Sequence, residues 1–84
     1  MNNLFSENMW LVWSNEHNAY WKPARRGYTK DKDAAGRYST AAATEICDNA
    51  NQFIPENRIP NEIMVPSPEL VSFLTLLWMA GVRR

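Results

Sequence analysis

WLVWSNEHNAYWKPARRGY, residues 10–28, is the stretch of this sequence that decides the fold. It holds three of the four tryptophans, two of the three tyrosines and the only histidine of the 84-residue chain. Residues 9–13 are short and rich in Trp and Val, a pattern typical of a β-strand. Residues 19–22 predict a second strand across the polar loop 14–18, and Pro23 ends it because proline has no N–H for the ladder. The stretch therefore predicts an antiparallel aromatic hairpin.

The first of these strands carries apolar side chains on both faces. Trp10 and Val12 lie on one face, and Leu11 and Trp13 on the other, because side chains alternate along a strand. We expect such a strand to be covered on both sides, or to expose an aromatic face to a partner.

A charged loop and a helix are predicted after the hairpin. Gly27 and Gly36 punctuate the loop, with Tyr28 and Tyr38 as its anchors. A helix is expected to start at Ser39 or Thr40, whose hydroxyl can accept a free N–H of the first turn. Pro55 stops it. Its apolar residues follow helical spacing and form one stripe: Ala43, Ile46, Cys47, Ala50 and Ile54.

A third strand is predicted over residues 62–65, with Ile63 and Val65 pointing inward. The last element is a helix with Ser67 as N-cap, Pro68 at its first position and Glu69 at the positive end of its dipole. One stripe of this helix is apolar, and the first interpretation is that it packs in the core: Leu70, Phe73, Leu74, Leu77 and Trp78. Further apolar residues lie well away from that stripe: Val71, Met79 and Val82.

This last helix is thus apolar around most of its circumference, and a helix of that kind in a small domain needs more covering than its own chain can give. Its second apolar side indicates an interface. The predicted fold is a small α+β domain of order ββαβα, in which an antiparallel hairpin-based sheet packs on one helix. Residues 1–8 are a flexible N-terminus, and residues 9–84 form the single domain.

Composition restricts the classes of function. Nine basic residues balance nine acidic ones, so no global field drives the chain onto nucleic acid or membrane. Cys47 is the only cysteine, which leaves no intramolecular disulfide and no cysteine-based metal cluster. The longest apolar stretch, residues 70–82, is interrupted and falls short of the roughly 18–20 residues that span a bilayer. We therefore expect a cytoplasmic protein.

Catalytic chemistry is weakly supported. His17 has Glu16 beside it, but adjacent residues on an extended chain point apart, and neither a second histidine nor a paired carboxylate is evident. Cys47 lies on the apolar stripe of a helix, which indicates a buried structural thiol. No phosphate-binding loop or metal-ligand spacing is present. We expect a protein that is not an enzyme and uses no metal or cofactor; an enzyme centred on His17 and Glu16 is the weakest alternative.

One segment has the logic of a binding site. Residues 22–37 hold six basic and two acidic residues, a local balance of +4. Lysine and arginine can neutralise phosphates while exposed rings stack on unpaired bases. The competing interpretation places the rings in the core and the charges on a solvated loop. The nucleic-acid alternative would use Lys22, Arg25, Arg26, Lys30, Arg37, Trp21 and Tyr28.

Several short motifs, in order along residues 9–68, resemble a group of short uncharacterised proteins encoded by bacteriophages and prophages. They are WLVWSNEH (10–17), YWKP (20–23), GYT (27–29), AGRYS (35–39) and IMVP (63–66). Many of those relatives have acidic residues just after the helix-starting serine, where this chain has Ala41 to Ala43. The last helix lies largely outside the resemblance, as an addition that could adapt a common core to one partner.

The resemblance implies a small accessory protein in the cytoplasm of a bacterial host cell. Small phage proteins of this kind often bind a host protein, for example as inhibitors of restriction or CRISPR defence. The first hypothesis is therefore a non-enzymatic module that binds and modulates a bacterial host or defence protein. The stripe from Leu70 to Trp78 would supply that contact or a homodimer interface.

Overall fold

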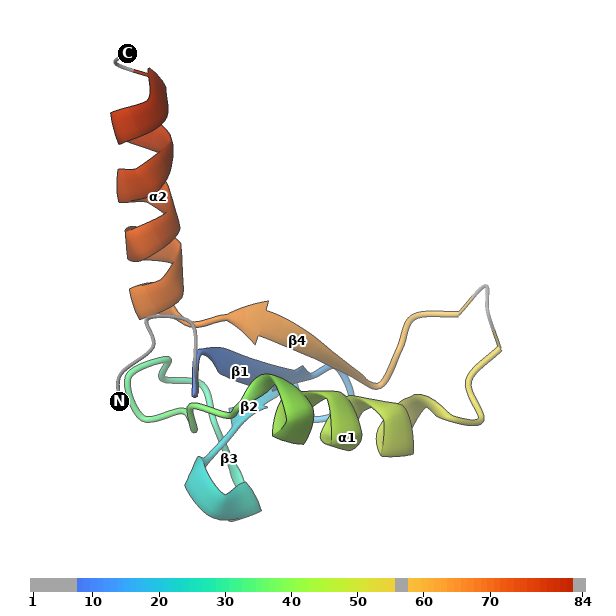
Figure 1. Ribbon diagram of the computed structural model, residues 1–84. Helices are drawn as coiled ribbons and strands as arrows, with labels where there is room; N and C mark the ends of the chain where they lie inside the picture. Colours follow the sequence, from blue (N-terminus) through green and yellow to red (C-terminus); the bar gives the residue numbers. More distant parts are fainter. Residues whose placement is uncertain (1–7, 56–57, 83–84) are drawn as a thin grey trace.

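The structure is a computed structural model, and it describes residues 8–55 and 58–82. Four antiparallel strands form one sheet in the order β3-β2-β1-β4. Helix α1 lies along one side of the sheet, whereas α2 projects away from its end (Figure 1). The elements are β1 (Trp10–Ser14), β2 (Ala19–Trp21), the 3-10 turn η1 (Pro23–Arg25), β3 (Tyr28–Thr29), α1 (Thr40–Asn51), β4 (Glu62–Pro66) and α2 (Pro68–Val82).

The predicted α+β class and the order of the long elements are confirmed, while η1 and the two-residue strand β3 were not predicted. Both lie in the segment interpreted as a charged loop, and two residues are too few for a strand pattern to register. Nearly all of the flexible N-terminus predicted over residues 1–8 lies outside the described residues.

Strand β1 is the centre of the sheet and is covered on both faces, as its sequence predicts. It pairs with β2 through Trp13↔Tyr20 and with β4 along its whole length. Leu11 and Val12, which point to opposite faces, are both 0% exposed. The two largest fully buried apolar side chains of the described residues therefore lie next to each other on one strand.

Helix α1 covers one face of the sheet. The hydroxyl of Ser39 accepts a hydrogen bond from the Ala42 N–H at 3.1 Å, which confirms the predicted N-cap. The buried residues of α1 pack with Val12 and Tyr38 in the main core; they are Ala43, Ile46 and Cys47. The helix ends at Asn51, so Ile54 lies beyond its end rather than on its stripe.

Of the two β4 residues predicted to point inward, Val65 is half-buried opposite the buried Leu11, but Ile63 was predicted wrongly. Met64 is paired with Val12 and packs against the α1 core, whereas Ile63 is 38% exposed. Residues 63–65 are all apolar, so the sequence offers no alternation from which the buried face can be read. The register with β1 decides the face instead, and it also places Glu62, which is only 4% exposed, opposite Ser14.

Tyr38 organises the loop between the hairpin and α1. It is buried, its hydroxyl donates to the Lys22 carbonyl, and the Arg25 N–H donates to the same hydroxyl at 3.0 Å. This contact holds the tight turn in which Ala24 has a positive φ of 59°. Gly36 lies against the turn, and a Cβ there would come within 2.9 Å of the Pro23 Cα. The predicted anchoring role of Tyr38 is confirmed.

Candidate functional site

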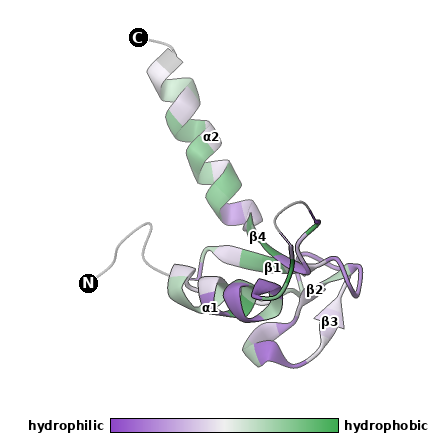
Figure 2. Cartoon of the chain, turned by 90° about the vertical axis from the view of Figure 1, so that its right-hand side faces the viewer, coloured by the Kyte–Doolittle hydropathy of each residue, from purple (hydrophilic) through white to green (hydrophobic). Residues whose placement is uncertain are grey.

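The outer turns of α2 present a continuous apolar surface to solvent. Six large side chains are between 46% and 67% exposed, and together they form what we call the α2 surface: Val71, Leu74, Leu76, Leu77, Trp78 and Met79. They lie around the whole helix, since at 100° per residue Leu76 is on the side opposite Leu74. Figure 2 shows this hydrophobic helix standing clear of the rest of the chain.

The predicted stripe on this helix is divided between two environments. Leu70 is 7% exposed and packs at the base of α2, and Phe73 is half-buried. Leu77 and Trp78 are 51% and 67% exposed. The interpretation of the whole stripe as core is therefore wrong beyond the first turns. The sheet and α1 form a two-layer body, and α2 projects away from that body after the end of β4 (Figure 1).

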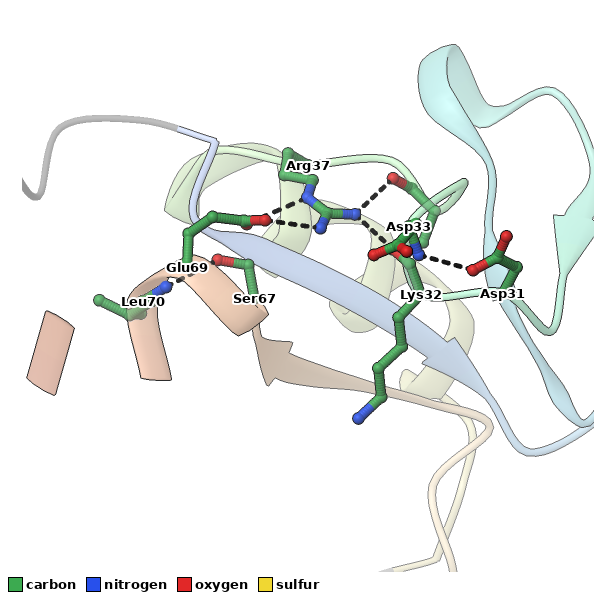
Figure 3. Close-up of polar contacts among 8 residues, drawn as sticks. Asp31, Lys32, Asp33, Arg37, Ser67, Glu69 and Leu70 are labelled. Carbon is green, nitrogen blue, oxygen red and sulfur yellow. Dashed lines mark hydrogen bonds and ion pairs between the residues drawn. The ribbon is translucent and has the colours of Figure 1, made fainter. Parts of the chain in front are cut away.

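Only the base of α2 is tied to the body by polar contacts among the described residues (Figure 3). Arg37 donates to both carboxylate oxygens of Glu69, at 2.9 and 3.2 Å, and its guanidinium also bonds to the carbonyls of Lys32 and Ala35. The hydrogen bond from Arg37 lowers the pKa of Glu69 and raises that of Arg37. Ser67 caps the helix by accepting from the Leu70 N–H at 3.2 Å.

Two of the cations predicted for the basic site are paired with carboxylates. Arg37 is occupied by Glu69, and Arg25 makes an ion pair of 3.0 Å with Glu45 on α1. The other predicted cations are exposed and form no ion pair with any described residue; these are Lys22, Arg26 and Lys30.

The two aromatic rings predicted for base stacking are engaged with protein rings. Trp21 is half-buried against the α1 core and meets Tyr28 edge to face at 5.1 Å. Tyr28 in turn stacks on the imidazole of His17, with ring centroids 3.9 Å apart. The competing interpretation, rings in the packed body and charges on a loop, fits this arrangement better than a stacking platform does.

The structure corrects the expectation that no paired carboxylate accompanies His17. One potential ligand atom from each of Glu16, His17 and Glu62 lies within 4.8 Å of the others. Residues 15–18 form a turn and not an extended chain, so Glu16 and His17 do not point apart. Glu62 comes from β4, 45 positions further along the chain, and no spacing pattern could have found it. Only the β1–β4 register, which places it opposite Ser14, reveals the cluster.

The negative charge of Glu62 contributes to raised pKa values of two neighbouring groups, Tyr28 and Cys47. Burial first, and then the negative charges of Glu62 and Glu16, raise the pKa of the Tyr28 phenol. Burial, with smaller contributions from Glu62 and Asp48, raises the pKa of the Cys47 thiol to about 11. Cys47 is 9% exposed, which confirms the predicted buried thiol; a group that holds its proton so firmly is a poor nucleophile at neutral pH.

No family model, curated protein or solved structure was found to match this chain. Of the helices in the described ranges, none has the length and apolar character to cross a bilayer. The α2 surface and the polar cluster around His17 are therefore the two candidate sites of this chain.

Proposed function

We propose that this protein is a non-enzymatic binding module, a phage or prophage accessory protein that binds and modulates a bacterial host or defence protein through α2. The observation that carries the proposal is the exposure of the α2 surface on a helix whose base is tied to the body through Arg37 and Glu69. An apolar helix of 15 residues is about 22 Å long and suits the helix-in-groove mode of recognition. Trp78 is its natural anchor, since aromatic residues dominate binding energy at such interfaces.

Without its partner, the same surface is expected to be covered by a second copy of the chain. Apolar side chains on all sides of a helix are removed from water when two helices pack, at roughly 25 cal/mol per Å². The isolated protein is therefore proposed to form a homodimer through α2, and the host protein would compete with that contact.

The test compares two single charges added to exposed helix positions. Leu77→Glu puts a carboxylate in the middle of the α2 surface, and Ala41→Glu puts one on the exposed side of α1. We expect Leu77→Glu to abolish both the homodimer and capture of a bacterial protein complex, and Ala41→Glu to leave both intact. Equal behaviour of the two variants in light scattering and affinity capture would refute the role of α2.

A specific hollow keeps the nucleic-acid alternative open. Trp13 and Tyr20 meet edge to face at 4.9 Å, and they line an open hollow together with Asn18, Lys30, Asp31 and Lys32. A base could pack on these rings while the two lysines approach its phosphates. Salt-dependent binding of single-stranded DNA or RNA, weakened by Lys30→Ala with Lys32→Ala and not by Arg25→Ala with Arg26→Ala, would support this second function. No binding at low salt would remove it.

A further inference from the structure

Glu62 is a nearly buried residue whose carboxylate accepts no hydrogen bond from any described residue. It is 4% exposed, and no hydrogen bond to its side chain is present among the described residues, although its backbone is firmly held. Asn51, the last residue of α1, accepts from the Glu62 N–H at 3.1 Å and donates to the Glu62 carbonyl at 2.8 Å. Carboxylates in such surroundings are generally paired with a cation or coordinate a metal ion, and a bound cation would supply the partner that the described residues do not.

The imidazole of His17 is held in place beside this carboxylate by two contacts. The Ser14 hydroxyl lies 3.1 Å from Nδ1 of His17 and also accepts from the His17 N–H at 3.1 Å. The ring of Tyr28 stacks on the imidazole with an interplanar angle of 15°. A hydroxyl on one ring nitrogen fixes the orientation of the ring and leaves the other nitrogen for a metal, the usual outer-shell arrangement of metal-binding histidines.

We propose that Glu16, His17 and Glu62 form a binding site for a divalent transition-metal ion. The donors lie within 4.8 Å of one another, and tetrahedral ligands with bonds of about 2.0–2.1 Å are about 3.4 Å apart. The exposed side chain of Glu16 can move toward the ion, and a small tilt of the held His17 ring closes the rest of the difference. One imidazole with two carboxylates suits Zn²⁺ or Mn²⁺ better than Mg²⁺, which prefers oxygen ligands alone.

The site has three protein ligands and opens to solvent on the side of Glu16 and His17. Remaining coordination positions are left for water or for an oxygen ligand from a bound partner. The cation would balance the charges of Glu16 and Glu62 and tie the β1–β2 turn to the start of β4. This proposal is independent of α2 and of the protein partner.

The test is titration of the full untagged chain with Zn²⁺, followed by calorimetry and by thermal unfolding. We expect one ion per chain, a rise in the melting temperature, and at least a tenfold loss of affinity in Glu62→Gln and in His17→Ala. Ser14→Ala should weaken binding by about tenfold because it frees the ring of His17. Since Glu62→Gln could disturb the fold, the exposed Glu16→Gln provides a second ligand variant, and circular dichroism checks each chain.

Two control variants separate this site from other zinc ligands. Cys47→Ala removes the only thiol, and Glu45→Gln removes a carboxylate on the surface of α1, away from the cluster. Both should keep the wild-type affinity. The proposal is overturned if Zn²⁺ does not bind stoichiometrically, if Glu16→Gln and Glu62→Gln bind as the wild type does, or if Cys47→Ala abolishes binding.

Discussion

The two helices of this protein make opposite use of apolar residues. Helix α1 offers a narrow stripe of small or medium side chains, and the fold buries it against the sheet. Helix α2 is far richer in large apolar residues, yet most of them are exposed. If burial in the chain's own core were the reason for that composition, α2 would be the covered helix. The contrast supports the proposal that α2 serves association, while α1 contributes its buried stripe to the core.

The largest expected effect on stability comes from replacing one leucine by alanine in the core and comparing it with the same replacement in α2. Leu11→Ala in β1 should lower the free energy of unfolding by about 2–5 kcal/mol, because Leu11 is fully buried and leaves a cavity. Leu77→Ala in α2 should cost less than about 0.5 kcal/mol in the monomer. Urea unfolding of dilute protein measures both. Similar losses would show that α2 is part of the stabilising core.

A smaller effect is expected from the hydroxyl that organises the loop of the body. Tyr38→Phe removes the hydrogen bonds to the Lys22 carbonyl and from the Arg25 N–H, and should cost about 1–3 kcal/mol. Tyr20→Phe is the control, since the Tyr20 hydroxyl makes no hydrogen bond with a described residue. Urea unfolding should leave the control near the wild type. An equally stable Tyr38→Phe would contradict the role given to this contact.

Much of the fold could be predicted from the sequence. The hairpin, both helix N-caps and the central strand with two buried faces follow from local patterns that the structure confirms. The β4 residue that faces α1 could not be predicted, because residues 63–65 are uniformly apolar and only the β1–β4 register places Met64 against the core.

Of the two candidate sites, one could be predicted from the sequence and the other could not. The excess of apolar residues on α2 pointed correctly to a surface that the described residues leave exposed, although Leu70 proved to be buried at the base of the helix. The cluster of Glu16, His17 and Glu62 was missed, because it depends on a turn and on the pairing of Ser14 with Glu62, 48 positions apart. The exclusion of Arg25 and Arg37 from a basic surface likewise depends on Glu45 and Glu69, which are distant in sequence.

The N-capping serines of the two helices can be compared through alanine variants, each of which loses a hydrogen bond that contributes about 1 kcal/mol. Ser39→Ala should lower global stability by about that amount, since α1 cannot fray without exposing the core. Ser67→Ala loses the same kind of hydrogen bond, but its effect should be confined to faster amide exchange along α2. Hydrogen exchange resolved by residue separates the two. Global destabilisation of equal size in both variants would mean that α2 and the body unfold as one unit.

The smallest expected effect concerns the ion pairs of the two helices. The folded pKa of Glu69 is lowered by Arg37, so the stabilisation is present above the ordinary pKa of a glutamate. It is lost as the pH falls through the lowered value. Glu69→Gln should cost less than about 1 kcal/mol at neutral pH, less again at high salt, and nothing at acid pH. Glu45→Gln, on α1, is the matched control, and pH-dependent unfolding in urea measures both. A Glu69→Gln penalty that persists at acid pH would contradict this account.

The most direct test of the central claim is the molar mass of the isolated chain by light scattering at micromolar concentration. The chain has a mass of 9.7 kDa. We predict a dimer for the wild type and for Ala41→Glu, and a folded monomer for Leu77→Glu with an unchanged circular dichroism signal from the body. A wild type that stays monomeric at every concentration, with Leu77→Glu indistinguishable from it, would contradict the claim that α2 is built for association.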